Sequence, residues 1–325
     1  MGKGLLSDMA KLTLAYNHVT PDLPKTVIAK LPPPQGYIRD QVLRLKLFEK
    51  EIRFYTEVAP KSPIRTPDLI YSAMDSEHQR HVLLLQDCSH YAEIDPQLDG
   101  LSYQQTKIIV LKIADFHARW WDDKSLSSFY WMPRFDDPEA KATNIDRFRF
   151  HWDACIQMED FKNALPEGGL KAGQKIYEQR PWLFETAPGD KLTVYHGDFK
   201  SDNMFFDRDT PQDPLVFFDW STVKIGRGTA DLSYLLGYCL ATELRRQYEK
   251  DVLRSYYDRL LDRGVTNYSF DECYSDYLRG LVYYIYYPVV QMRFFSDARG
   301  QRVSTTGLQR MFSAVLDNEA TRILP

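Results

Sequence analysis

In the first quarter of the chain, hydrophobic residues either alternate with polar ones or form short β-branched runs. The alternation over residues 11–16 and the run over residues 26–31, which three prolines follow, predict two β-strands. Residues 69–73 and 81–86 predict two more strands, separated by a polar turn. Between these pairs, hydrophobic residues recur at helical spacing from about residue 40 to residue 57 and predict a helix.

After a polar break at residues 86–89, the hydrophobic pattern becomes mainly helical. Ser102 and the polar residues after it carry a capping signature, so we expect a helix to begin there. Residues 230–250 and 270–292 predict further helices. Pro288 predicts a kink in the second of these, because proline cannot donate the helical hydrogen bond.

The change of pattern places a lobe boundary after residue 88. Residues 1–88 are expected to form a small antiparallel sheet with one helix, and residues 89–325 a larger, mainly helical lobe. A chain of 325 residues is long enough for two such lobes. The predicted fold class is therefore α+β.

Composition and charge narrow the function classes. The formal net charge of −4 argues against general nucleic-acid binding, which relies on basic surfaces. The four cysteines are scattered without a Cys-x-x-Cys pair, so they indicate neither a zinc site nor a disulfide framework. The first seven residues lack a secretory h-region, and no apolar run reaches the roughly twenty residues that span a bilayer. We therefore expect a cytoplasmic protein without a membrane span.

The candidate chemistry is concentrated in residues 195–203, Tyr-His-Gly-Asp-Phe-Lys-Ser-Asp-Asn, and in Asp219 at the end of an apolar strand. Phosphoryl transfer from ATP needs a carboxylate that orients and deprotonates a hydroxyl, and oxygen ligands that hold Mg²⁺ against the phosphates. Asp198 suits the first task, and Asn203 with Asp219 suits the second. The alternative is a polar hairpin, since these residue types are common in turns. The strand-terminal Asp219 favours the phosphoryl-transfer hypothesis.

Lys30 is a charged residue on a strand that is otherwise suited to burial. Burying an ammonium is costly unless it meets an anion. In a kinase it would contact the α- and β-phosphates of ATP, and a glutamate on the next helix would hold it in place. Glu51 is the preferred partner and Glu49 the substitute. The alternative is that Lys30 extends to water at the strand end.

Four further positions are candidates for nucleotide and phosphate contacts. Gly4 and Ser7, together with Gly2, could form a turn that covers the phosphates with backbone N–H groups, although any flexible N-terminus would look the same. Because the strand that normally leads into such a turn is absent, either the start is truncated or mis-assigned or the turn is short. Lys200 either neutralises charge on the migrating phosphoryl group or is a solvated loop lysine.

Residues around the motif are expected to support it. His196 is interpreted as a brace that hydrogen-bonds the backbone of the loop, because Asp198 already fills the role of the base. Asp231 is expected to cap the helix that follows it, and it could also tie down the loop. The many tyrosines between residues 274 and 287 are expected to pack a core rather than to line a cleft.

These residues resemble the aminoglycoside phosphotransferase and choline kinase superfamily, and most of all its ecdysteroid kinase-like (CHK kinase-like) branch. The match extends over Lys30, Glu51, Phe54, Tyr55, residues 114–120, His196, Gly197, Asp198, Asn203, Asp219, Gly226, Gly228, Asp231 and Leu232.

The resemblance implies a protein-kinase-like two-lobed fold, with a nucleotide-binding lobe at residues 1–88 and a catalytic and substrate-binding lobe at residues 89–325. It also implies ATP and Mg²⁺ as cofactors and a small-molecule hydroxyl as acceptor. Position by position, Asp198 corresponds to the base, Asn203 and Asp219 to the metal ligands, and Lys30 with Glu51 to the phosphate-binding pair. Gln86 stands where the family often carries a glutamate that positions the nucleotide.

Two other functions are weighed against a small-molecule kinase. A protein kinase is the nearest rival, but Gly197 replaces the arginine of its catalytic loop and Trp220 follows Asp219 where a phenylalanine is expected. The segment after Asp219 is also too short for a peptide-docking loop. A non-catalytic nucleotide-binding protein is disfavoured because Lys30, Asp198, Asn203 and Asp219 are all present. The acceptor stays open between a cationic amino alcohol and a sterol-like or polyketide hydroxyl.

Overall fold

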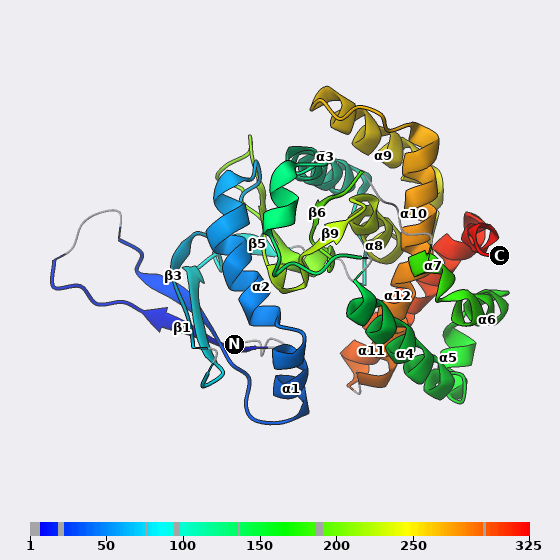
Figure 1. Ribbon diagram of the computed structural model, residues 1–325, viewed down its shortest axis with the longest axis horizontal. Helices are drawn as coiled ribbons and strands as arrows, with labels where there is room; N and C mark the ends of the chain where they lie inside the picture. The colour runs from blue at the N-terminus through cyan, green and yellow to red at the C-terminus, as the bar shows by residue number, and fades with distance from the viewer. Residues whose placement is uncertain are drawn as a thin grey trace. The chain divides into compact units, whose positions relative to one another are not determined.

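The computed structural model describes residues 7–18, 23–75, 77–93, 98–135, 137–185, 191–294 and 297–325. The chain forms two compact units, Met1–Glu93 with Asn203–Val223, and Ile94–Asp202 with Lys224–Pro325. The first unit thus contains a segment, residues 203–223, that lies well beyond the boundary expected after residue 88. The structure is a mixed α+β fold (Figure 1), as the sequence predicted.

The first unit is built on a four-stranded antiparallel sheet with the order β1-β2-β4-β3. All four predicted strands are present, and alternate side chains of β4 are buried, among them Leu83 and Leu85. A smaller antiparallel sheet has the order β5-β7-β8. The strands of this unit are β1 Asp8–Thr13, β2 Thr26–Leu31, β3 Leu69–Asp75, β4 Arg80–Gln86, β5 Ala92–Glu93, β7 Met204–Phe206 and β8 Leu215–Phe217.

The helix predicted over residues 40–57 is divided into segments, and the prediction of one helix is wrong. Helix α1, Tyr37–Arg44, ends before Lys46, whose φ of 51° lies in the left-handed region and interrupts the helical hydrogen bonds. Helix α2, Leu47–Arg53, then continues into a π-helical turn at Phe54–Val58. Val42 of α1 and Phe48 of α2 belong to one buried cluster. Hydrophobic residues are therefore needed on both sides of the break, and their helical spacing in the sequence continues through it.

The second unit is mainly helical and contains a two-stranded antiparallel sheet of β6, Thr193–Tyr195, and β9, Lys224–Gly226. Helix α3 begins at the predicted position with a capping box between Ser102 and Gln105. The helices are α3 Tyr103–Arg119, α4 Pro138–Cys155, α5 Glu159–Ala164, α6 Gly169–Gln179, α7 Trp182–Glu185, α8 Thr229–Cys239, α9 Thr242–Asp262, α10 Phe270–Tyr284, α11 Tyr286–Phe294 and α12 Ala298–Asp317.

Two long predicted helices are each divided in two. The helix predicted over residues 230–250 is interrupted at Leu240 and Ala241, which separate α8 from α9. The helix predicted over residues 270–292 ends at Tyr284 and restarts at Tyr286. Pro288 has no N–H for the carbonyl of Tyr284, four residues earlier, so the chain breaks one turn before the proline instead of bending at it.

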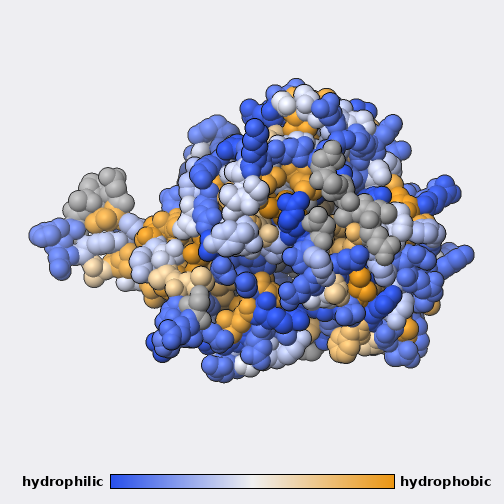
Figure 2. Space-filling view, in the orientation of Figure 1, coloured by the Kyte–Doolittle hydropathy of each residue, from blue (hydrophilic) through white to orange (hydrophobic). Residues whose placement is uncertain are grey.

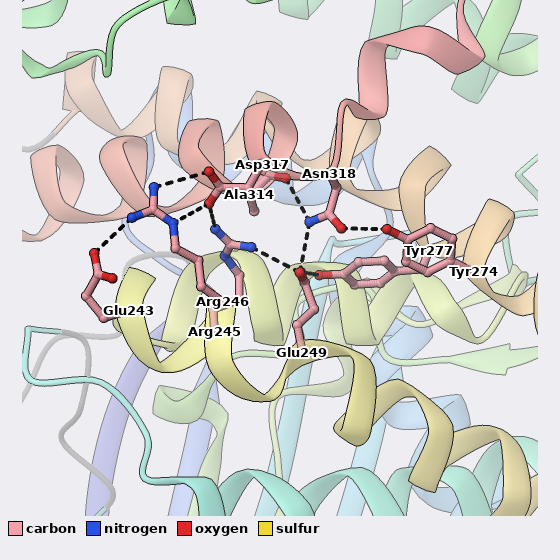
Figure 3. Close-up of polar contacts among 9 residues, drawn as sticks. All are labelled: Glu243, Arg245, Arg246, Glu249, Tyr274, Tyr277, Ala314, Asp317 and Asn318. Atoms are coloured by element: carbon pink, nitrogen blue, oxygen red, sulfur yellow. Dashed lines mark hydrogen bonds and ion pairs between the residues drawn. The ribbon is translucent and has the colours of Figure 1, made fainter.

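A buried polar network joins α9, α10 and α12 (Figure 3). Arg245, which is 1% exposed, contacts Glu249 at 3.0 Å and also pairs with Asp317. The Tyr277 hydroxyl donates to Glu249, and the Asn318 side-chain amide donates to the same carboxylate at 2.9 Å. These contacts link the three helices, although the buried Nε of Arg245 has no hydrogen-bond partner among the described residues.

The surface of the visible face is mostly hydrophilic, with hydrophobic residues in smaller patches (Figure 2). Among the residues with described positions, no helix combines the length and the apolar character needed to cross a bilayer.

Candidate functional site

In the first unit, the predicted Lys30–Glu51 pair is formed. The Lys30 ammonium, on β2, lies 2.7 Å from both carboxylate oxygens of Glu51, on α2. It also lies 3.5 Å from Oδ1 of Asp219, which follows β8. Glu51 is 1% exposed, so its charge is shielded from water and is directed at the lysine. Three residues that are distant in sequence thus meet at one ammonium group.

The charges of this cluster are set by burial and by the two carboxylates. Burial alone would lower the pKa of Lys30, but Asp219 and Glu51 outweigh it and raise the pKa above its usual value. Lys30 therefore stays protonated at neutral pH. One ammonium faces two carboxylates, and this excess of negative charge suits the approach of a cation at Asp219.

Asn203 and Asp219 lie at the same end of the β7–β8 hairpin. The strands pair Met204 with Phe217, and the Phe218 N–H donates to the Asn203 carbonyl at 3.0 Å. Asn203 immediately precedes β7 and Asp219 follows β8 by two residues, so the antiparallel pairing brings the two positions to one edge of the small sheet.

The backbone of Asp219 is strained and firmly anchored. Its φ and ψ are both 60°, in the left-handed region that a residue with a side chain rarely adopts. The next residue, Trp220, is fully buried, and its ring stacks on Phe54 of the π-helical turn with centroids 3.9 Å apart. The Ser221 hydroxyl donates to Oδ1 of Asp219 at 2.8 Å and helps to orient the carboxylate.

The oxygen atoms at this edge fit Mg²⁺, the metal expected from the resemblance noted in the sequence. The Asp219 side chain is 37% exposed, so its carboxylate is accessible to an ion. Magnesium takes one or two protein oxygen ligands and completes its shell with water and phosphate oxygens. Within the described ranges, no group of three or more His, Cys, Asp or Glu residues could hold a metal by itself. A site made of one carboxylate and one amide is therefore suited to a metal that arrives with phosphates.

In the second unit, Asp198 and Lys200 form a close pair on the loop after β6. The Lys200 ammonium lies 2.8 Å from Oδ2 of Asp198, and the two side chains are 19% and 15% exposed. Burial would lower the pKa of Lys200, but the Asp198 carboxylate outweighs it and raises that pKa. Lys200 is therefore a paired, half-buried cation rather than a solvated one.

Asp231, which is fully buried in the first turn of α8, hydrogen-bonds the backbone of this loop. Its carboxylate accepts hydrogen bonds from the backbone N–H groups of His196 at 2.7 Å and Gly197 at 2.9 Å. The prediction that Asp231 caps α8 is wrong, because the N-cap is Gly228 and no side chain caps this helix. The alternative, that Asp231 ties down the loop, is the one observed.

Other side chains complete the support of the loop. The ring of His196 is buried, and its Nδ1 accepts from the backbone N–H of Asp198 at 3.3 Å, as expected of a brace. The hydroxyls of Tyr284 and Tyr287 both donate to the Gly197 carbonyl, at 3.1 and 3.2 Å. These tyrosines pack as expected, but their hydroxyl groups also fix the carbonyl side of the loop.

The ecdysteroid kinase-like family matches residues 1–264. The chain belongs to this family.

Solved structures with the same fold include several small-molecule kinases. A candidate aminoglycoside phosphotransferase of Ralstonia eutropha has a TM-score of 0.60 and 15% identity, over 100% of this chain and 92% of its own. An ethanolamine kinase of Plasmodium vivax has a TM-score of 0.57 and 12% identity, over 94% and 79%. The GDP complex of wild-type aminoglycoside 2'-phosphotransferase-IIIa has a TM-score of 0.53 and 14% identity, over 97% and 91%. These likenesses confirm the predicted kinase-like fold.

A Caenorhabditis elegans protein described as an uncharacterized oxidoreductase is 24% identical over 261 residues. The match covers 75% of this ecdysteroid kinase-like chain but 30% of that protein, so the chain spans less than a third of the curated relative. The description belongs to the whole of the longer protein and is not carried over.

The remaining predicted nucleotide contacts of this family member are only partly described. Gly4 lies outside the described residues. Ser7 is a bend residue just before β1. Gln86 ends β4, and its side-chain oxygen accepts from the Asp68 N–H at 3.3 Å. The roles of these three residues stay predictions.

One supporting residue of this family member was missed from sequence. Arg180 is fully buried, and its guanidinium donates to the carbonyls of Val282 and Tyr283 at 3.1 and 3.0 Å and to Asn144 Oδ1 at 2.8 Å. It therefore satisfies carbonyls at the end of α10, next to Tyr284, which holds the loop. No local pattern around residue 180 indicates this role.

Proposed function

We propose that this chain is a kinase that transfers the γ-phosphoryl group of ATP to a hydroxyl of a small molecule. The observation that carries the proposal is the cluster in which Lys30 contacts Glu51 and Asp219, since kinases bind the triphosphate with a lysine held by a glutamate and with a nearby aspartate that holds Mg²⁺. The ethanolamine kinase and the GDP-bound phosphotransferase of the same fold support a nucleotide and a small acceptor.

The roles follow from the chemistry of each group. Lys30 would bind the α- and β-phosphates, with Glu51 fixing its position. Asn203 and Asp219 would hold Mg²⁺, which offsets the negative charge of the phosphates. Asp198 would orient the acceptor hydroxyl and take its proton as the hydroxyl oxygen bonds to the γ-phosphorus and the bond to the ADP oxygen breaks. Lys200, already paired with Asp198, would offset charge on the migrating group. The proposal requires all these residues to act on one triphosphate.

The test is Mg²⁺-dependent ATP consumption with a pool of amino alcohols and apolar alcohols, with mass spectrometry to find a product heavier by one phosphate. Asp198→Asn is expected to lower turnover by at least about a hundredfold while nucleotide binding, measured by calorimetry, is retained. The matched control is Asp202→Asn on the same loop. Asp202 is exposed, and this variant should keep its turnover.

Three outcomes would contradict parts of the proposal. Unchanged turnover in Asp198→Asn would remove Asp198 as the base. Phosphate transfer to proteins and to no small molecule would favour a protein kinase. Nucleotide binding without turnover, across the acceptor pool and a cell extract, would favour a non-catalytic protein.

A further inference from the structure

The second unit contains a cavity beside the two-stranded β6–β9 sheet that the proposed chemistry does not use. Its empty volume is about 650 Å³, part of which is open to solvent. Its walls include Tyr195 of β6, Ile225 of β9, Tyr283 of α10 and Leu183 of α7.

The apolar walls of the cavity are rigid. Tyr195 is 1% exposed, and a Cβ atom at Gly226 would lie 2.8 Å from its ring carbon Cε1, closer than real Cβ contacts allow. Gly226 therefore lets the Tyr195 ring approach the β9 backbone closely. Phe135 stacks on Phe184 at 5.0 Å and closes another side. A flat or extended apolar group would find aromatic surfaces already in place.

Three charged residues also line the cavity, and two of them are arginines. Arg227 Nη1 lies 3.5 Å from Oδ2 of Asp276, which also accepts from the Tyr268 hydroxyl at 3.0 Å. The guanidinium of Arg279 lies over the Trp182 ring, 4.9 Å from its centroid. Among the described residues, the buried Nε of Arg227 has no hydrogen-bond partner. The described lining residues thus carry one net positive charge and an N–H donor without a partner among them.

We propose that this cavity binds a small molecule with an aromatic or aliphatic body and one carboxylate, which Arg227 and Arg279 receive. The apolar body replaces water against Tyr195 and Tyr283. The carboxylate neutralises the excess positive charge and accepts hydrogen bonds from the guanidinium groups, whose planar forks match it. A cationic ligand of the same shape meets two like charges and one carboxylate that is already paired.

The cavity is coupled by chain connectivity to the loop that carries Asp198. Tyr195 immediately precedes His196, and Ala230, which lines the cavity, immediately precedes Asp231. Asp231 in turn holds the N–H groups of His196 and Gly197. A bound carboxylate would therefore reduce the motion of two segments that position the loop, and protection of these amides from hydrogen exchange should increase.

The test compares three ligands that share one body, 3-phenylpropionate, 3-phenylpropan-1-ol and 3-phenylpropylamine, by calorimetry without nucleotide. The acid is expected to bind about tenfold more tightly than the alcohol, because charge-assisted hydrogen bonds are worth more than neutral ones. The amine is expected to bind more weakly than the alcohol. Because no phosphoryl transfer is measured, failure of the kinase proposal would not affect this result.

Two variants with effects of opposite sign separate the site from general loss of folding. Arg279→Met should weaken binding of the acid about tenfold and leave the alcohol unchanged. Asp276→Asn should tighten binding of the acid, since it removes the only carboxylate among the described lining residues and keeps an oxygen for the Tyr268 hydroxyl. Equal binding of acid and amine, weaker acid binding in Asp276→Asn, or no binding of any of the three at about 10 mM would overturn the proposal.

Discussion

The fully buried carboxylate of Asp231 provides the sharpest test of how the loop is held. In the native protein, the Asp231 carboxylate accepts hydrogen bonds from two backbone N–H groups. Replacing Asp231 by Asn keeps one of its oxygens but places an amide NH₂ opposite one of these two N–H groups. The variant therefore loses one charge-assisted hydrogen bond, worth about 1.5–3 kcal/mol, and leaves a buried donor unsatisfied, at a cost of about 1–3 kcal/mol. We expect the free energy of unfolding to fall by about 2.5–6 kcal/mol.

The assay is urea unfolding, combined with hydrogen exchange at the amides of His196 and Gly197. These two amides should lose protection more than the rest of the second unit, because the substitution removes their acceptor directly. Asp137→Asn is the matched control. Asp137 is the exposed N-cap of α4, and its side chain accepts hydrogen bonds from two backbone N–H groups. Because asparagine caps equally well, the free energy of unfolding should change by less than about 1 kcal/mol. Unchanged stability and unchanged protection of both amides in Asp231→Asn would refute the reasoning.

Three more outcomes are expected. In calorimetry, Asp219→Ala should weaken the binding of ATP in the presence of Mg²⁺ and should not weaken it in the absence of Mg²⁺. An unaltered ATP affinity in the presence of Mg²⁺ would remove Asp219 from the metal site. Burial, with the positive charges of Arg39 and Lys30, lowers the pKa of His81 to about 4 from 6.5. The unfolded chain thus takes up a proton first, so the free energy of unfolding should fall as the pH drops from about 6.5 to 4, and His81→Phe should flatten that slope in acid titrations followed by circular dichroism. Arg180→Met removes the guanidinium donors of the Val282 and Tyr283 carbonyls and of Asn144 Oδ1 and should lower the midpoint of thermal unfolding, while Arg180→Lys should recover only part of the loss because one ammonium cannot reach all three oxygens.

The strands and the reactive motif could be predicted because their signals are local. The strands of the first unit follow from β-branched runs and from a proline stop, and Lys30 stands out because it interrupts such a run. Its pairing with Glu51 could be predicted because an ammonium on a buried strand needs an anion, and a glutamate on the next helix is the nearest source.

Helix boundaries could not be predicted where tertiary packing decides them. Lys46 has no sequence feature that marks a left-handed residue. The break lies there while residues of α1 and α2 pack into one buried cluster, and the sequence does not show that packing. The spacing of hydrophobic residues continues through such a break, so a periodic pattern cannot reveal it. Pro288 did indicate a disruption, but its effect fell on the carbonyl four residues earlier.

The supporting contacts of the loop were hidden for a different reason. Asp231 at the start of a helix has the sequence signature of a cap, and only the fold shows that its carboxylate faces the loop instead. The hydroxyls of Tyr284 and Tyr287 reach Gly197 from nearly ninety residues away, which no local pattern reports.

The polar network between α9, α10 and α12 has a consequence for how this chain can diverge. Loss of one member would leave a charged or polar partner buried without compensation, whereas exchange of the whole set for apolar side chains of similar volume can be nearly neutral. Homologues should therefore vary at positions 245, 249, 277 and 317 in concert, with polar sets in some lineages and aliphatic sets in others. Single departures should be rare in living sequences.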